Sequence, residues 1–203
     1  MKPVEIYRTI YPRLPEVLDE DTLAEIVTME SEERAFILEK TVPRQQYLRA
    51  LYLKSMRYLG HSRLNPGRMP LQLRNGLIDQ LGLPKTLIKL RRIDSGEKSR
   101  IVREVRAFLG MKPHKKKEKG QLARWLEKEV AGEEGDLITV INVAIEYLVP
   151  RGIELPPFTE LSAAAGKALT DADEKLQDRL GRALDDWRQV TLPTDDNYTS
   201  PFS

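Results

Sequence analysis

Regularly spaced arginines are the residues of this sequence best suited to bind a ligand. Arg100, Arg103 and Arg106 recur at every third position of a segment whose apolar residues have helical spacing. We therefore expect them on one solvent-facing side of a helix. Guanidinium groups on such a face can contact phosphates or guanine edges while the apolar face anchors the helix. An ordinary solvated face, partly ion-paired by Glu97 and Glu104, is the alternative.

Further basic residues extend this surface along the chain. Lys115, Lys116 and Lys117 form a run suited to sequence-independent attraction of phosphates rather than to base readout. Phe108 is the one aromatic residue among the arginines, so few side chains are available for the bases of a single strand to stack on. Duplex DNA is therefore the favoured ligand. The predicted DNA-binding residues are Arg44, Gln45, Arg49, Arg57, Arg63, Arg68, Arg91, Arg92, Lys98, Arg100, Arg103, Arg106, Lys115, Lys116 and Lys117.

The net charge of the 203-residue chain is only +2, but the charge is unevenly distributed. Residues 41–120 contain 20 Lys and Arg against 5 Asp and Glu, whereas the remainder contains 13 basic and 26 acidic residues. A block this basic, with the apolar periodicity of a folded protein, is typical of a domain that binds a polyanion. Two alternatives stay open: a solvated Lys/Arg-rich surface, and a protein–protein interaction module whose basic face docks an acidic partner.

The sequence offers no pattern for catalysis. It has no cysteine and two histidines, His61 and His114, which we expect to be exposed or close to phosphates. Neither the spacing of a zinc site, nor a phosphate-binding glycine loop, nor a nucleophile elbow is present. Asp185 and Asp186 could in principle bind magnesium, but adjacent helical residues point in different directions. We therefore expect no enzymatic activity, no cofactor and no metal.

Glycine and proline separate short helical patterns, and no run alternates as a strand would. The sequence predicts an all-α fold of tandem small, helix-turn-helix-like modules at 1–95 and 96–160. A C-terminal helix and a disordered tail are predicted at 161–203. Neither a secretory signal nor a membrane-spanning apolar segment is recognisable, so we expect a cytoplasmic, nucleoid-associated protein without membrane contact. The predicted helices are Asp21–Val27, Thr28–Lys40, Arg44–Leu59, Leu71–Leu81, Lys85–Leu90, Lys98–Leu109, Gln121–Val130, Leu137–Leu148 and Phe158–Val190, the last as one helix or two meeting near Thr170.

Six segments, in order and at matching spacing, resemble the N-terminal region of transposases of the Tn-three family. These are large replicative enzymes of the DDE type. The segments are TMESEERAF (Thr28–Phe36), LRALYLKSMRYLG (Leu48–Gly60), MPLQLRNGLIDQLGLP (Met69–Pro84), SRIVREVRAFLGMKP (Ser99–Pro113), LARWL (Leu122–Leu126) and RGIELPPFTEL (Arg151–Leu161).

The resemblance implies paired helical modules that recognise the terminal inverted repeats of a transposon as double-stranded DNA. It implies that transposition and DNA recombination are performed by the rest of a transposase or by a partner transposase. That rest includes an RNase H-like catalytic domain, which is absent from these residues. The loop His61–Pro66 departs from the family, which usually has an Arg/Phe-Pro step soon after the glycine matching Gly60. A stand-alone regulator of transposition that competes for the same DNA ends is the alternative.

Overall fold

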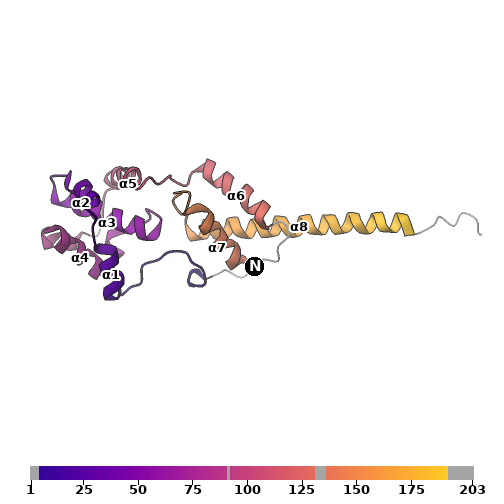
Figure 1. Cartoon of the computed structure of the whole chain (residues 1–203), viewed down its shortest axis with the longest axis horizontal. Coiled ribbons are helices and arrows are strands. Elements are labelled where there is room, and N and C mark those ends of the chain that lie inside the picture. The colour runs from indigo at the N-terminus through magenta and orange to yellow at the C-terminus, as the bar shows by residue number, and fades with distance from the viewer. Residues whose placement is uncertain (1–4, 91, 131–135, 192–203) are drawn as a thin grey trace, which may run out of the picture.

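The computed structural model describes residues 5–90, 92–130 and 136–191 and is all-α, as predicted. Within those ranges it contains eight α-helices, three short 3-10 helices and no strand (Figure 1). The last helix runs without interruption through Thr170, so one helix, not two, ends the described chain. The helices are α1 (Glu20–Val27), α2 (Ser31–Leu38), α3 (Pro43–Leu59), α4 (Leu71–Leu81), α5 (Ser95–Leu109), α6 (Lys116–Val130), α7 (Leu137–Leu148) and α8 (Phe158–Thr191), with η1 (Ile6–Arg8), η2 (Pro66–Arg68) and η3 (Lys85–Lys89).

Helix α3 is the centre of a first hydrophobic cluster. Every residue from Tyr47 to Met56 is buried, because α1, α2, α4 and α5 surround the helix. Pro43 occupies the first turn, where its missing N–H costs no hydrogen bond. Gly60 ends the helix with a φ of +67°, a conformation that glycine adopts without steric cost.

A second hydrophobic cluster lies between α6, α7 and the first three turns of α8. Leu126, Ile141 and Leu161 are fully buried within it. The N-terminal segment joins this cluster, because Tyr11 is buried there and its hydroxyl donates to the carbonyl oxygen of Pro156 at 2.7 Å. In Figure 1 this segment accordingly runs past α7 before the chain enters the first cluster at α1.

The packing differs from the predicted division of the chain at residue 95. Helix α5 packs on α3, and its residues Ile101, Val102 and Val105 belong to the first cluster. Tyr11, within the predicted first module, belongs to the second cluster. Ser95 and Gly96 begin α5, but local composition carries no information on which helices the apolar face of α5 meets.

The second half of α8 extends beyond the helices that cover its first half (Figure 1). Ala168 is the last buried residue described in this helix, and Leu176, Leu180 and Leu184 are more than half exposed. Among the described residues, no helix combines the length and the apolar character needed to cross a membrane.

Candidate nucleic-acid interface

Helix α5 is held with one face inward and one face outward. Asp94 caps its N-terminus by accepting hydrogen bonds from the backbone N–H groups of Gly96 and Glu97, at 2.8 and 3.1 Å. Ile101, Val102 and Val105 are buried against the first cluster. This packing fixes which residues of α5 face solvent.

The outer face of α5 carries two arginines among small residues. Arg100 and Arg103 are exposed, and neither forms an ion pair with any residue of the described ranges. Gly96, Ser99 and Ala107 share this face and are exposed as well. Because Ser99 and Ala107 have short side chains and Gly96 has none, the helix backbone can approach a flat or grooved partner closely. The two guanidinium groups can then reach past the backbone to the partner.

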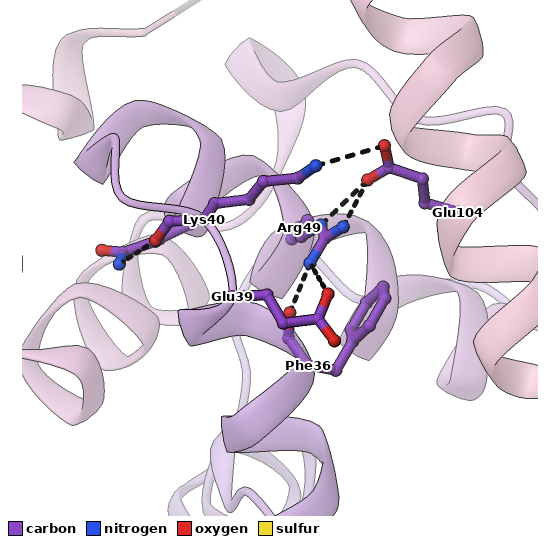
Figure 2. Close-up of polar contacts among 6 residues, drawn as sticks. Phe36, Glu39, Lys40, Arg49 and Glu104 are labelled. Atoms are coloured by element: carbon purple, nitrogen blue, oxygen red, sulfur yellow. Dashed lines mark hydrogen bonds and ion pairs between the residues drawn. The ribbon is translucent and has the colours of Figure 1, made fainter.

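Two carboxylates on a different side of α5 tie the helix to α3. Glu97 accepts from Arg44 at 2.8 Å in an ion pair at the protein surface. Glu104 accepts from Arg49 Nη2 at 2.7 Å and pairs with Lys40 at 3.4 Å (Figure 2). Because Glu97 and Glu104 pair with residues outside α5, neither of them forms an ion pair with Arg100 or Arg103.

Arg49 was predicted to contact DNA, but the fold buries its side chain. Its side chain is 5% exposed, and its guanidinium group is enclosed by Glu39, Glu104, the carbonyl oxygen of Phe36 and the Phe36 ring. The ring centroid lies 4.3 Å from the guanidinium carbon. A side chain that is buried and fully engaged by fixed partners presents no donor to a duplex. Arg49 therefore positions α5 rather than contacting a ligand.

Arg106 is likewise committed to the fold rather than to the face of Arg100 and Arg103. Its Nε donates to Glu154 Oε2 at 2.9 Å, and its Nη2 donates to Ser62 Oγ at 3.1 Å. Glu154 is almost completely buried and also accepts from the backbone N–H of Ser62 at 2.6 Å. The predicted row of three arginines is therefore a row of two, because Arg106 joins α5 to the segments that precede α4 and α8.

The remaining predicted residues fall into three groups. Arg57, Arg63 and Lys98 contact other parts of the chain, through Glu30 and Glu33, Leu155 and Tyr11, and Leu64, respectively. Arg44 and Gln45 are half-buried, and Arg91 lies outside the described residues. Arg68, Arg92, Lys115, Lys116 and Lys117 are exposed, as are Arg57 and Arg63 of the first group.

A basic hollow that the sequence analysis missed lies between α6, α7 and the segment after α5. Lys112, Lys117, Arg124 and Arg151 line it together with the stacked rings of Trp125 and Tyr147. These residues come from segments that are distant in sequence, and only the fold brings them together. The adjacent Arg-Trp step in α6 was the one local hint, because a guanidinium beside an aromatic ring is common where nucleic acids bind.

Family membership follows from a match that covers both clusters. A model of the domain of unknown function DUF4158 matches residues 5–168. The chain belongs to the DUF4158 family. No curated protein matches it. The matched region contains α1 to α7, the start of α8, the outer face of α5 and the basic hollow, so every element of the candidate interface is part of the DUF4158 domain.

The two histidines of the DUF4158 domain are half-buried, whereas the sequence led us to expect them exposed or close to phosphates. Burial, reinforced by the charge of Arg63, lowers the pKa of His61 to about 4, although Glu154 opposes this shift. The His61 ring stacks on Tyr11, with ring centroids 5.9 Å apart. Burial also lowers the pKa of His114. Within the described part of the chain, no group of three or more His, Asp or Glu residues could hold a metal ion.

Proposed function

We propose that this chain binds duplex DNA through the outer face of α5, as the N-terminal DNA-binding region of a replicative transposase. The observation that carries the proposal is that exposed Arg100 and Arg103 lie on one helix face among small residues. These are Gly96, Ser99 and Ala107. A major groove about 12 Å wide admits an α-helix. Short side chains allow the helix to enter deeply, and arginine can then contact guanine edges or phosphates.

The ion pairs between α3 and α5 support this function by holding the helix in one orientation. The buried Arg49 pairs with Glu104, and Arg44, whose side chain is 41% exposed, pairs with Glu97. A recognition helix that is already fixed loses less conformational freedom when it binds. The buried Arg49 therefore contributes to DNA binding indirectly, through the position of Arg100 and Arg103.

The start of α6 supplies the contacts with the phosphates of the DNA backbone. Lys115, Lys116 and Lys117 are exposed there, and the N-terminal end of a helix carries a partial positive charge. Both features attract phosphates regardless of base sequence. Contacts of this kind fix the register of a protein on the duplex while α5 reads the groove.

The resemblance of six ordered segments to Tn-three-family transposases supports the terminal inverted repeats of a transposon as the target. In that setting the chain recognises the DNA ends, and strand transfer belongs to a catalytic domain elsewhere in the transposase. The same DNA affinity would serve a regulator that competes for these ends. A complementation assay with a transposase deprived of its own N-terminal region separates the two, because only a transposase module restores transposition.

The direct test is fluorescence anisotropy of a labelled random-sequence duplex, titrated with the chain at several salt concentrations. We expect the logarithm of the affinity to fall steeply with the logarithm of the salt concentration. Arg100→Ala with Arg103→Ala should weaken binding about tenfold or more. If both arginines contact phosphates, the double substitution also lowers the salt slope by about 2.

The matched control removes two exposed arginines from the far half of α8, Arg179→Ala with Arg182→Ala. It has the same change in net charge and should retain most of the affinity. Equal loss in both double variants would mean that only net charge matters and would refute the α5 interface. Absence of binding at low salt would refute DNA binding altogether.

A further inference from the structure

We propose that the basic hollow between α6 and α7 is a second contact site, which binds phosphates of the DNA backbone. This inference rests on the proposed function and adds to it a site in the second hydrophobic cluster, separate from α5. The hollow has a volume of about 660 Å³ and is lined by Lys112, Lys117, Arg124, Arg151, Trp125 and Tyr147, among others.

Backbone pairing brings the two ends of the hollow together. The N–H of Lys112 donates to the carbonyl oxygen of Gly152 at 2.7 Å, and the N–H of Glu154 donates to the carbonyl oxygen of Lys112 at 2.8 Å. This parallel bridge between Lys112 and Ile153 fixes the segment after α5 against the turn after α7. Lys112 and Arg151 therefore line the same hollow although 39 positions separate them.

The two guanidinium groups of the hollow are held by the protein with donors to spare. Arg151 Nη1 donates to the carbonyl oxygen of Tyr147 at 2.9 Å, and its guanidinium carbon lies 3.8 Å from the Tyr147 ring centroid. Arg124 Nε donates to the carbonyl oxygen of Gly120 at 3.2 Å. Each guanidinium carries five N–H donors, so most remain for a ligand. Side chains that are already oriented lose less entropy when they bind.

The net positive charge of the residues that line the hollow favours an anionic ligand. Four cationic side chains line it, against the single carboxylate of Glu118. Glu118 already accepts a hydrogen bond from the N–H of Lys115 at 3.2 Å, and backbone hydrogen bonds lower its pKa. Glu118 therefore caps α6 and stays ionised. It neutralises only part of the positive charge, and the excess suits a ligand that carries several phosphates.

The position of the hollow favours the backbone of a polynucleotide over a free phosphate compound. Lys112 follows the last residue of α5, Leu109, by three positions, which limits the chain between them to about 11 Å. Lys115 and Lys116 are exposed beside the hollow and continue the positive surface. In Figure 1 the chain passes directly from α5 to α6 on one side of the molecule. One duplex that contacts Arg103 can thus extend to the hollow.

Trp125 provides a reporter that is specific for this site. The chain has two tryptophans, and the other, Trp187, lies in the far half of α8. In a Trp187→Phe variant, the emission of Trp125 reports on the hollow alone. Titration with a random-sequence duplex of about 30 base pairs should change this emission with the same midpoint as the anisotropy of the labelled duplex. Inorganic pyrophosphate at equal phosphate concentration should leave it nearly unchanged.

Substitutions then separate the two sites. In the Trp187→Phe background, Arg124→Ala with Arg151→Ala should weaken duplex binding about tenfold and abolish the emission change. The α5 variant, Arg100→Ala with Arg103→Ala, should weaken binding but keep the emission change at saturating duplex. A Lys112→Glu variant, altered at an exposed position that lines the hollow, should reproduce the effect of the Arg124 and Arg151 substitutions if either of those perturbs folding.

The possible failures are distinguishable. Normal duplex anisotropy without any change in Trp125 emission would overturn the second site and leave the proposed function standing. An emission change with pyrophosphate but not with duplex would overturn the choice of ligand. Absence of both duplex anisotropy and emission change would overturn the proposed function together with the site that rests on it.

Discussion

Glu104 of α5 accepts two hydrogen bonds from the guanidinium group of Arg49 in α3, at 2.9 Å from Nε and 2.7 Å from Nη2. Partial burial alone would raise the pKa of Glu104, but the hydrogen bonds and charges of Arg49 and Lys40 outweigh it, and the pKa is lowered. Helix α3 carries the anchoring Arg49, and helix α5 carries the exposed Arg100 and Arg103. The orientation of the candidate DNA-binding face therefore depends on this contact between α3 and α5.

Loss of the Glu104 carboxylate should destabilise the fold measurably. We expect Glu104→Gln to lower the free energy of unfolding by about 1–3 kcal/mol, because Arg49 stays buried and loses a charged acceptor. Glu97→Gln is the matched control: it removes the partner of Arg44, whose side chain is 41% exposed, and should cost at most about 1 kcal/mol. Urea denaturation followed by circular dichroism measures both. Equal effects of the two substitutions would contradict the structural role of the buried pair.

His61 should make the fold sensitive to mild acid. Its pKa is about 4 in the folded chain against 6.5 ordinarily, so the unfolded chain takes up a proton first. Its contribution to stability is complete above pH 6.5 and is lost progressively as the pH falls from 6.5 toward 4. His61→Gln should flatten the fall in urea midpoint over this range. NMR titration of the two histidines checks the cause directly, and a His61 midpoint near 6.5 would contradict it.

Truncation of Arg106 should lower the stability of the fold, whereas truncation of Arg103 should lower the affinity for DNA, although both are arginines of α5. Arg106→Ala leaves the Glu154 carboxylate, which is 5% exposed, without its cation, so we expect a loss of about 2–4 kcal/mol in the free energy of unfolding. Arg103→Ala changes an exposed residue and should stay within about 0.5 kcal/mol. DNA binding by Arg103→Ala should fall while its stability is kept. A stable Arg106→Ala variant with reduced DNA affinity would return Arg106 to the interface.

The helices themselves could be predicted closely from the sequence. Leu71–Leu81 and Leu137–Leu148 have the same bounds in the prediction and the structure, and Gly60 and Gly110 end their helices as expected. These features depend on short-range periodicity and on the conformational freedom of glycine. Both can be recognised from residues that are close together in the sequence.

The candidate site could be predicted only in part, because burial depends on distant residues. The helical spacing of α3 gave no sign that four other helices would enclose it, so Arg49 was predicted to contact DNA and the burial of the basic residue Lys54 was not foreseen. Lys54 in fact pairs at 2.7 Å with Glu33, which lies in α2 and is completely buried. The basic hollow was missed for the same reason, since a bridge between residues 112 and 153 assembles it.

Gly60 should tolerate alanine less well than Gly82, although both end a helix with positive φ. At φ values of +67° and +63°, alanine costs about 1–2 kcal/mol at either position. A Cβ at Gly60 would also lie 3.2 Å from Leu155 Cδ1, whereas nothing lies within 4 Å of one at Gly82. We therefore expect Gly60→Ala to have the lower urea midpoint of the two.

Leu155→Ala isolates the packing part of the Gly60 effect. Leu155 is fully buried, and its N–H donates to the carbonyl oxygen of Gly60 at 2.8 Å, so the two residues join the end of α3 to the second cluster. In the Leu155→Ala background, the Cβ that Gly60→Ala introduces no longer meets the leucine side chain, and the costs of the Gly60 and Gly82 substitutions should become equal. Since contacting residues typically couple by about 0.5–3 kcal/mol, a double-mutant cycle resolves the difference. A gap that persists without the Leu155 side chain would show that backbone strain at Gly60, not contact with the second cluster, sets its intolerance.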